Sequence, residues 1–209
     1  MVPVLQQELN KFKETTIVRL IEHFFKNNDA GVRYLQLLQG QKVSLDIDHI
    51  TIRCLDVEER AKAFLTIGYI DKNEKVEYPE QGWWAKVYRK EYYPAIFIDQ
   101  AYSDERGKKS PLELWVKKFG DNLLHHVAVR VKNIDQTKTA LEQKGVEFSG
   151  DVIGGPGTRL RQIFTAAEIK NGSPFTVLEL TERNNYDGFY PDQADGLMKS
   201  STKTRSTRG

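Results

Sequence analysis

The chain has 209 residues, and its 31 basic and 29 acidic side chains leave a net charge of +2, so neither a nucleic-acid nor an anionic-membrane partner is expected. No apolar run approaches the ~18 residues that a membrane-spanning helix needs, and the amino terminus has no signal-peptide h-region. A single cysteine, Cys54, excludes an internal disulfide and a multi-cysteine metal site. We therefore expect a cytoplasmic protein with one sizeable domain or two small modules that share a core.

Residues 1–44 are expected to form a helical segment. Apolar residues recur at helical spacing from Leu5 to Phe25, which predicts one amphipathic helix ended by the NNDAG sequence. A shorter helical turn follows through Val32 to Leu38. His23 is interpreted as an ordinary helix histidine and is not assigned to a site.

Residues 45–102 are expected to form a first module. A strand around His49 precedes a helix that ends near Gly68. Turn residues then separate three predicted strands, Ile70–Tyr78, Trp83–Arg89 and Tyr93–Ala101. The predicted order is β-α-β-β-β.

Residues 103–122 are expected to form a linker with a short helix that closes on glycine, and residues 123–183 a second module. This module has a strand around His126, the helix IDQTKTALEQKG, a short strand VEFSG, and the strands LRQIFTAA and FTVLELTER. Its order is again β-α-β-β-β. Residues 184–209 are expected to dock through their aromatic side chains and to end in a mobile basic tail.

The two modules are copies of one unit. The stretch LLHHVAVRVKNID repeats IDHITIRCLDV position by position, so that His126 matches His49 and Arg130 matches Arg53, at the offset 126 − 49 = 77. A lone strand histidine is usually an ordinary core or surface residue. Two histidines at matched positions of a repeat favour a shared site.

Apolar residues alternate with the polar ones in both strands, which predicts that His49 and Arg53 share one face. The same alternation predicts that Asp48 points to the opposite face and that His125 points away from His126. Arg53 is long enough to lean toward a ligand and clamp its carboxylate. The alternative for this arginine is an ordinary ion pair with Asp48 or Glu58.

Glu179 lies inside the otherwise apolar strand TVLEL, where an ionised carboxylate is costly unless it is paired or metal-bound. One alternative is an ion pair with Arg161 or Arg130. If the first strands of the modules lie together, His49, His126 and Glu179 would form a two-histidine, one-carboxylate set, the pattern of non-heme Fe(II) oxygenases. Zn²⁺, Mn²⁺ or Ni²⁺ would also suit such ligands.

The segments DHITIRCLD, FLTIGY, YPAIFIDQ and FTVLELTER resemble the vicinal oxygen chelate superfamily of glyoxalases and dioxygenases, and within it the 2-oxoadipate dioxygenase/decarboxylase (hydroxyglutarate synthase) family. LRQIFT resembles the carboxy-terminal part of 4-hydroxyphenylpyruvate dioxygenase. The likeness covers roughly residues 45–185. It implies an α+β fold whose two modules form a curved mixed sheet around a metal cleft.

The resemblance also implies a site and an activity. It implies His49, His126 and Glu179 as iron ligands, Arg53 as the clamp for the substrate carboxylate, and Gln162 as a residue facing the cavity. The expected function is Fe²⁺-dependent oxidative decarboxylation and hydroxylation by O₂ of a small 2-oxo acid, for example one that resembles 2-oxoadipate. The alternatives are a glyoxalase-like metal-dependent isomerase or lyase and a non-catalytic carboxylate-binding module. We expect a monomer or a homodimer.

Overall fold

The computed structural model describes residues 2–191, 193, 196 and 197. Its contacts divide the chain into two compact units. The first unit contains the chain up to Asp48 together with the chain from Val127 onward, and the second unit is His49–His126. Among the described residues, no helix is both long enough and apolar enough to cross a bilayer.

The first unit opens with three helices. These are α1 (Pro3–Leu9), α2 (Thr15–Asn27) and α3 (Asp29–Gln41). The prediction of one helix from Leu5 to Phe25 is therefore wrong. The buried residues Phe12 and Ile17 are five positions apart, which rotates the apolar face by about 140° at 3.6 residues per turn, so a continuous helix would not bury both on one side. The side chain of Asn28 caps α3 by accepting the backbone N–H of Gly31 at 2.8 Å.

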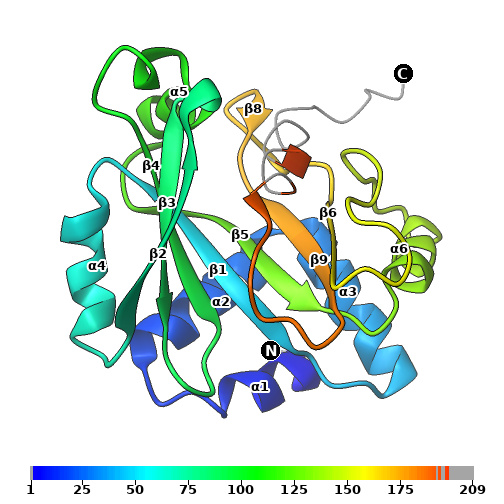
Figure 1. The fold of residues 1–209 in the computed structure, drawn as a ribbon. Coiled ribbons are helices and arrows are strands. Elements are labelled where there is room, and N and C mark those ends of the chain that lie inside the picture. Colours follow the sequence, from blue (N-terminus) through cyan, green and yellow to red (C-terminus); the bar gives the residue numbers. More distant parts are fainter. Residues whose placement is uncertain (1, 192, 194–195, 198–209) are drawn as a thin grey trace. The chain divides into compact units, whose positions relative to one another are not determined.

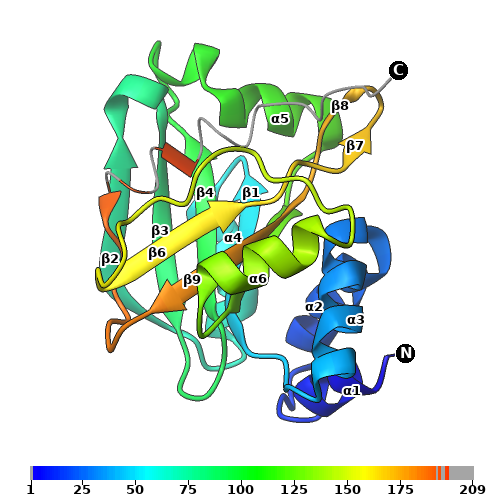
Figure 2. The ribbon, with the colours of Figure 1, turned by 90° about the vertical axis from the view of Figure 1, so that its right-hand side faces the viewer.

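The rest of the first unit is built on two long strands and one helix. The elements are α6 (Ile134–Glu142), β6 (Leu160–Phe164), β9 (Val177–Arg183), and a small hairpin of β7 (Ile169–Lys170) and β8 (Ser173–Pro174). Strands β6 and β9 pair antiparallel, and α3 packs beside α6 (Figure 2).

The short strand expected at VEFSG is replaced by isolated bridges from Phe148 to Thr165 and from Ile153 to Gln162. The second bridge lies directly before Gly154, whose φ of +92° is left-handed. A Cβ at this glycine would lie 2.3 Å from the carbonyl oxygen of Leu160, so the GGPG segment serves as a tight connection into β6.

The second unit contains most of the first module and the linker. Its elements are β1 (Ile47–Cys54), α4 (Val57–Leu65), β2 (Ile70–Tyr78), the 3₁₀ turn η1 (Pro79–Gln81), β3 (Trp83–Arg89), β4 (Ala95–Ala101), the 3₁₀ turn η2 (Gly107–Lys109), α5 (Pro111–Phe119) and β5 (Leu123–Arg130). Strands β2, β3 and β4 lie side by side with α4 packed against β3 and β4 (Figure 1). Strand β4 pairs parallel with β1 and antiparallel with β3.

The strand order in the sheet is β2-β3-β4-β1-β5-β9-β6. Strand β1 starts in the first unit and continues into the second. Strand β5 starts in the second unit and ends in the first. The sheet is mixed, because β1 and β4 are parallel whereas β2/β3, β3/β4 and β6/β9 are antiparallel. The predicted α+β fold class is confirmed.

The repeat extends to the ends of its helices. Asp56 and Asn133, which are 133 − 56 = 77 residues apart, each cap a helix by accepting the backbone N–H three residues on. At the other ends Gly68 and Gly145, also 77 residues apart, have φ values of +88° and +80°. Both helices therefore stop on a left-handed glycine, which has no Cβ to oppose that conformation.

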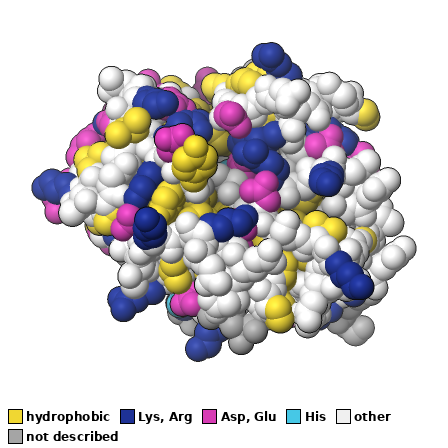
Figure 3. Space-filling view, turned by 90° about the horizontal axis from the view of Figure 1, so that it is seen from below, with side chains coloured by type: hydrophobic (Ala, Val, Ile, Leu, Met, Phe, Trp, Pro, Cys, Tyr) yellow, Lys and Arg dark blue, Asp and Glu magenta, His cyan; other side chains and the backbone are white. Residues whose placement is uncertain are grey.

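The carboxy-terminal extension docks on the first unit. Leu197 is 5% exposed and packs with Phe164, Ala167 and Val177. The predicted basic tail at residues 201–209 lies outside the described residues. Figure 3 shows basic and acidic side chains interspersed on one face of the molecule.

Candidate functional site

The second unit brings the two matched histidines together. His49 comes from β1 and His126 from β5, and their Nε2 atoms are 3.3 Å apart. The rings meet edge to face with centroids 5.4 Å apart, and both residues are buried. The hydroxyl of Thr51, two residues after His49, lies 2.8 Å from Nε2 of His126.

His125 also belongs to this group, so the prediction that it points away from His126 is wrong. Its Nδ1 lies 2.8 Å from Nδ1 of His126, at hydrogen-bond distance. Strand alternation fixes only the direction in which each Cβ leaves the backbone, and the ring nitrogens lie beyond it. The ring of Trp115 in α5 packs edge to face on His125, with centroids 5.8 Å apart.

Burial controls the protonation of these imidazoles. It holds the pKa of His126 well below its usual value, and the neighbouring His49 and Arg53 lower it further. Burial likewise lowers the pKa of His125, assisted by the charge of Arg53 and by His126. Both rings are therefore neutral near pH 7, which is the form that binds a metal ion.

Arg53 lies on β1 with its guanidinium carbon 5.1 Å from the ring centroid of Trp115, in a cation–π contact. It is opposite Asp99 in the register of β1 and β4. Burial lowers the pKa of Arg53 to about 10, partly offset by Asp99, and burial raises the pKa of Asp99 to about 7 against the charge of Arg53. Of the alternative partners for Arg53, Glu58 contacts Lys86 at 2.6 Å.

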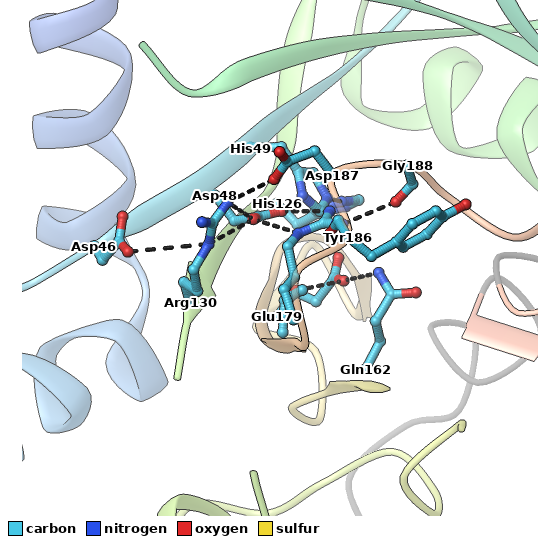
Figure 4. Close-up of polar contacts among 12 residues, drawn as sticks. Asp46, Asp48, His49, His126, Arg130, Gln162, Glu179, Tyr186, Asp187 and Gly188 are labelled. Carbon is cyan, nitrogen blue, oxygen red and sulfur yellow. Dashed lines mark hydrogen bonds and ion pairs between the residues drawn. The ribbon is translucent and has the colours of Figure 1, made fainter. Parts of the chain in front are cut away.

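The other alternative partner, Asp48, contacts Arg130 (Figure 4) and Arg183, both in the first unit. Arg183 donates Nε and Nη2 to it at 2.6 and 2.8 Å, and Arg130 donates Nη2 at 2.9 Å. The side chains of Asp48 and Arg183 are only 2% and 4% exposed. Arg183 also donates to the carbonyl oxygens of Tyr186 and Gly188, which fastens the segment after β9.

Glu179 lies on β9 and is 1% exposed. Its Oε1 accepts a hydrogen bond from Nε2 of Gln162 at 2.6 Å (Figure 4) and another from the hydroxyl of Thr181 at 3.0 Å. Of the arginines considered as its partners, Arg161 contacts Asp135 at 2.8 Å, and Arg130 contacts Asp48 as described above. Gln162, on β6, thus orients the carboxylate of Glu179.

Sequence reasoning did not place Trp115, Asp99 or His125 beside Arg53. Asp99 carried a usable signal, because it is an acidic residue inside the apolar strand AIFIDQA, as Glu179 is inside TVLEL. Trp115 carried none, since its position depends on how α5 packs. Cys54 is buried, and burial raises the pKa of its thiol to about 12, so the thiol stays protonated near pH 7.

A separate cavity of about 810 Å³ lies in the first unit, between the end of α3 and the start of α6. Its lining includes Tyr34, Lys42, Arg130 and Arg183. None of the predicted site residues lines it.

No protein-family model and no curated protein matches the chain. Among solved structures, hydroxyglutarate synthase from Oryza sativa in complex with 2-oxoadipate is similar with a TM-score of 0.73 at 16% identity, over 95% of this chain and 93% of that one. A Shewanella frigidimarina protein with a provisional hydrolase name has a TM-score of 0.70 at 19% identity, over 90% and 98%. A methylmalonyl-CoA epimerase has a TM-score of 0.50 at 28% identity, over 66% and 95%. These likenesses show a shared fold with differing activities.

Proposed function

The chain has the vicinal oxygen chelate fold, and from this premise we propose that it is an Fe(II)-dependent dioxygenase that decarboxylates and hydroxylates a small 2-oxo acid. The observation that carries the proposal is the pair of matched, buried histidines, one from each copy of the repeat, with Nε2 atoms 3.3 Å apart. The likeness to a fold that holds 2-oxoadipate in hydroxyglutarate synthase supports the choice of substrate class.

We assign the metal to His49, His126 and Glu179, a buried group of two imidazoles and one carboxylate that could hold an ion. The donor set fits Fe²⁺, because the pKa of His126 is lowered and the carboxylate of Glu179 is oriented by hydrogen bonds from Gln162 and Thr181. Zn²⁺, Mn²⁺ and Ni²⁺ accept the same donors, so the identity of the metal is part of the proposal.

The course of the chain supports Glu179 as the third ligand. Each histidine is the neighbour in sequence of a residue of the first unit. His49 follows Asp48, and His126 precedes Val127. Within the first unit, the carboxylate of Asp48 forms an ion pair at 2.6 Å with Arg183, the last residue of β9. Glu179 lies four residues before Arg183 on the same strand.

A second contact with β9 is made by the residue that comes directly after β5, the strand that carries His126. The backbone N–H of Val131 donates to the carbonyl oxygen of Thr181 at 2.9 Å. Thr181 is two residues from Glu179 and its hydroxyl donates to that carboxylate. Both histidine strands are thus connected, within the first unit, to the strand that carries Glu179.

Bound iron would supply the Lewis acid for the keto acid and the activation of O₂. Arg53 is the cation that we assign to the substrate carboxylate, since its charge lies on the same strand as His49 and burial strengthens its attraction for an anion. Asp99 competes for that charge, so the clamp would hold a carboxylate more firmly when Asp99 is protonated. Trp115 stacks on the guanidinium and restricts its motion.

A second candidate is a metal-dependent isomerase or lyase, which would use the same ligands to stabilise an enediolate. The likeness to a methylmalonyl-CoA epimerase favours keeping it. Such an enzyme consumes no oxygen, which separates the two candidates. A carboxylate-binding module without turnover would bind 2-oxo acids and change none of them.

The test is oxygen uptake and CO₂ release by protein reconstituted with Fe(II) under anaerobic conditions and then given air and a series of 2-oxo acids that includes 2-oxoadipate. We expect uptake with at least one acid, and loss of iron in His126→Ala. His23→Ala is the matched control, because His23 is an exposed histidine of α2. Iron retained by His126→Ala would contradict the metal site, and turnover without oxygen uptake would favour the isomerase. Light scattering in the same preparation would distinguish a monomer from a homodimer.

A further inference from the structure

We propose that His125 is a positioning residue for His126. The Nδ1 of His125 accepts the Nδ1–H of His126, so that His126 presents Nε2 to the metal. The inference rests on the proposed function, because it assigns a role beside the same metal site. It starts from the 2.8 Å contact between the two Nδ1 atoms, which joins buried neighbours on β5.

The surroundings of each nitrogen determine which atom of His126 can bind. Its Nδ1 is engaged by His125, whereas its Nε2 lies 3.3 Å from Nε2 of His49 and 2.8 Å from the hydroxyl of Thr51. A neutral imidazole carries one N–H and one lone pair. If Nε2 uses its lone pair for a metal, the proton is on Nδ1, and His125 must act as the acceptor. The opposite tautomer would place a proton on Nε2 and block ligation.

The ring of His125 is held in place from outside the strand. Trp115 meets it edge to face at 5.8 Å with an interplanar angle of 89°. The same indole carries the guanidinium of Arg53 at 5.1 Å, so the tryptophan is fixed by a second contact. A ligating histidine is generally oriented by an acceptor on its other nitrogen, and here a second histidine takes the place usually filled by a carboxylate or a carbonyl.

The first test is nuclear magnetic resonance on ¹⁵N-histidine-labelled protein with and without Zn²⁺, a diamagnetic probe for the site. We expect Zn²⁺ to shift Nε2 of His126, Nδ1 of the same ring to remain protonated, and a through-hydrogen-bond coupling to join it to Nδ1 of His125. A Zn²⁺-bound His126 with its proton on Nε2, or without the coupling, would overturn the positioning role alone. Absence of any Zn²⁺ effect on His126 would overturn the metal site as well.

The second test uses two substitutions at one position. His125→Asn keeps an acceptor, because the amide Oδ1 occupies the place of Nδ1, and His125→Leu removes it. We expect about 10- to 100-fold weaker Zn²⁺ binding in the leucine variant, the usual effect of losing such a partner, and recovery of most of the affinity in the asparagine variant. Circular dichroism confirms the fold of each. If the folded His125→Leu variant binds Zn²⁺ as tightly as the wild type, the positioning role is refuted. It is also refuted if the His125→Asn variant binds Zn²⁺ as weakly as the His125→Leu variant.

Discussion

Asp48→Asn is expected to destabilise the protein strongly, because Asp48 is the shared partner of two arginines. Its side chain is 2% exposed, and it accepts from Arg183, which is 4% exposed, at 2.6 and 2.8 Å. Arg130 adds contacts at 2.9 and 3.2 Å. The amide keeps the shape of the carboxylate and one acceptor oxygen but removes the charge.

The expected cost is about 3–5 kcal/mol, the usual penalty for leaving one member of a buried ion pair without its counter-charge. At about 2–4 °C per kcal/mol for a chain of this size, the melting temperature should fall by about 6–20 °C. Urea unfolding followed by circular dichroism measures the free energy, and an unchanged slope with denaturant would show that the loss is one of stability.

Asp46→Asn is the matched control, since Asp46 faces the same Arg130 at 3.9 Å with a side chain that is 59% exposed. An exposed pair of this kind contributes about 0–1 kcal/mol. A difference between the two variants below about 1 kcal/mol would refute the reasoning that burial, and not charge alone, makes Asp48 important.

The remaining predictions concern particular positions. Gly154→Ala should lower the free energy of unfolding in urea by about 2–4 kcal/mol, since the added Cβ would lie 2.3 Å from the carbonyl oxygen of Leu160. Gly172→Ala, at a positive φ but with no atom within 4 Å, should lower it by only about 1–2 kcal/mol. Equal losses in the two variants would exclude the clash. Burial raises the pKa of Asp99 to about 7, so between about pH 4 and pH 7 the folded state binds a proton here that the unfolded state does not. The free energy of unfolding that Asp99 contributes therefore falls as the pH rises through that window. Asp99→Asn should flatten this part of a pH series of thermal unfolding, and an unchanged slope would contradict the assignment. Leu197→Ala should cost about 2–4 kcal/mol and Leu114→Ala, which is 59% exposed, less than about 0.5 kcal/mol; a neutral Leu197→Ala would mean that the extension does not contribute to the core.

Local pattern was sufficient for most of the elements. Strands β2 and β3 have the bounds that turn residues predict, because Pro79 and Gly82 lie between them and Pro94 follows β3. The amino-terminal helix was predicted as one piece, since helical spacing on either side of Phe12 looks continuous unless the angle between the two apolar faces is worked out. The prediction of a strand at VEFSG was wrong, because this segment forms an isolated β-bridge at Phe148 and not a continuous run of strand pairs.

The histidine pair could be predicted because the repeat relates His49 to His126 by position alone. Its surroundings could not. The contact of His125 depends on side-chain rotation, and that of Trp115 depends on the packing of α5, neither of which leaves a period in the sequence. The acceptor role of Asp48 was hidden for a related reason, since its partners Arg130 and Arg183 are distant in the chain.

The guanidinium of Arg183 serves two segments at once, the strand before the first histidine and the turn after β9. Among natural variants of this chain we therefore expect positions 48 and 183 to covary, with an uncharged residue at one accompanied by an uncharged residue at the other. A lineage that lost the pair would also need a new way to hold its carboxy-terminal turn.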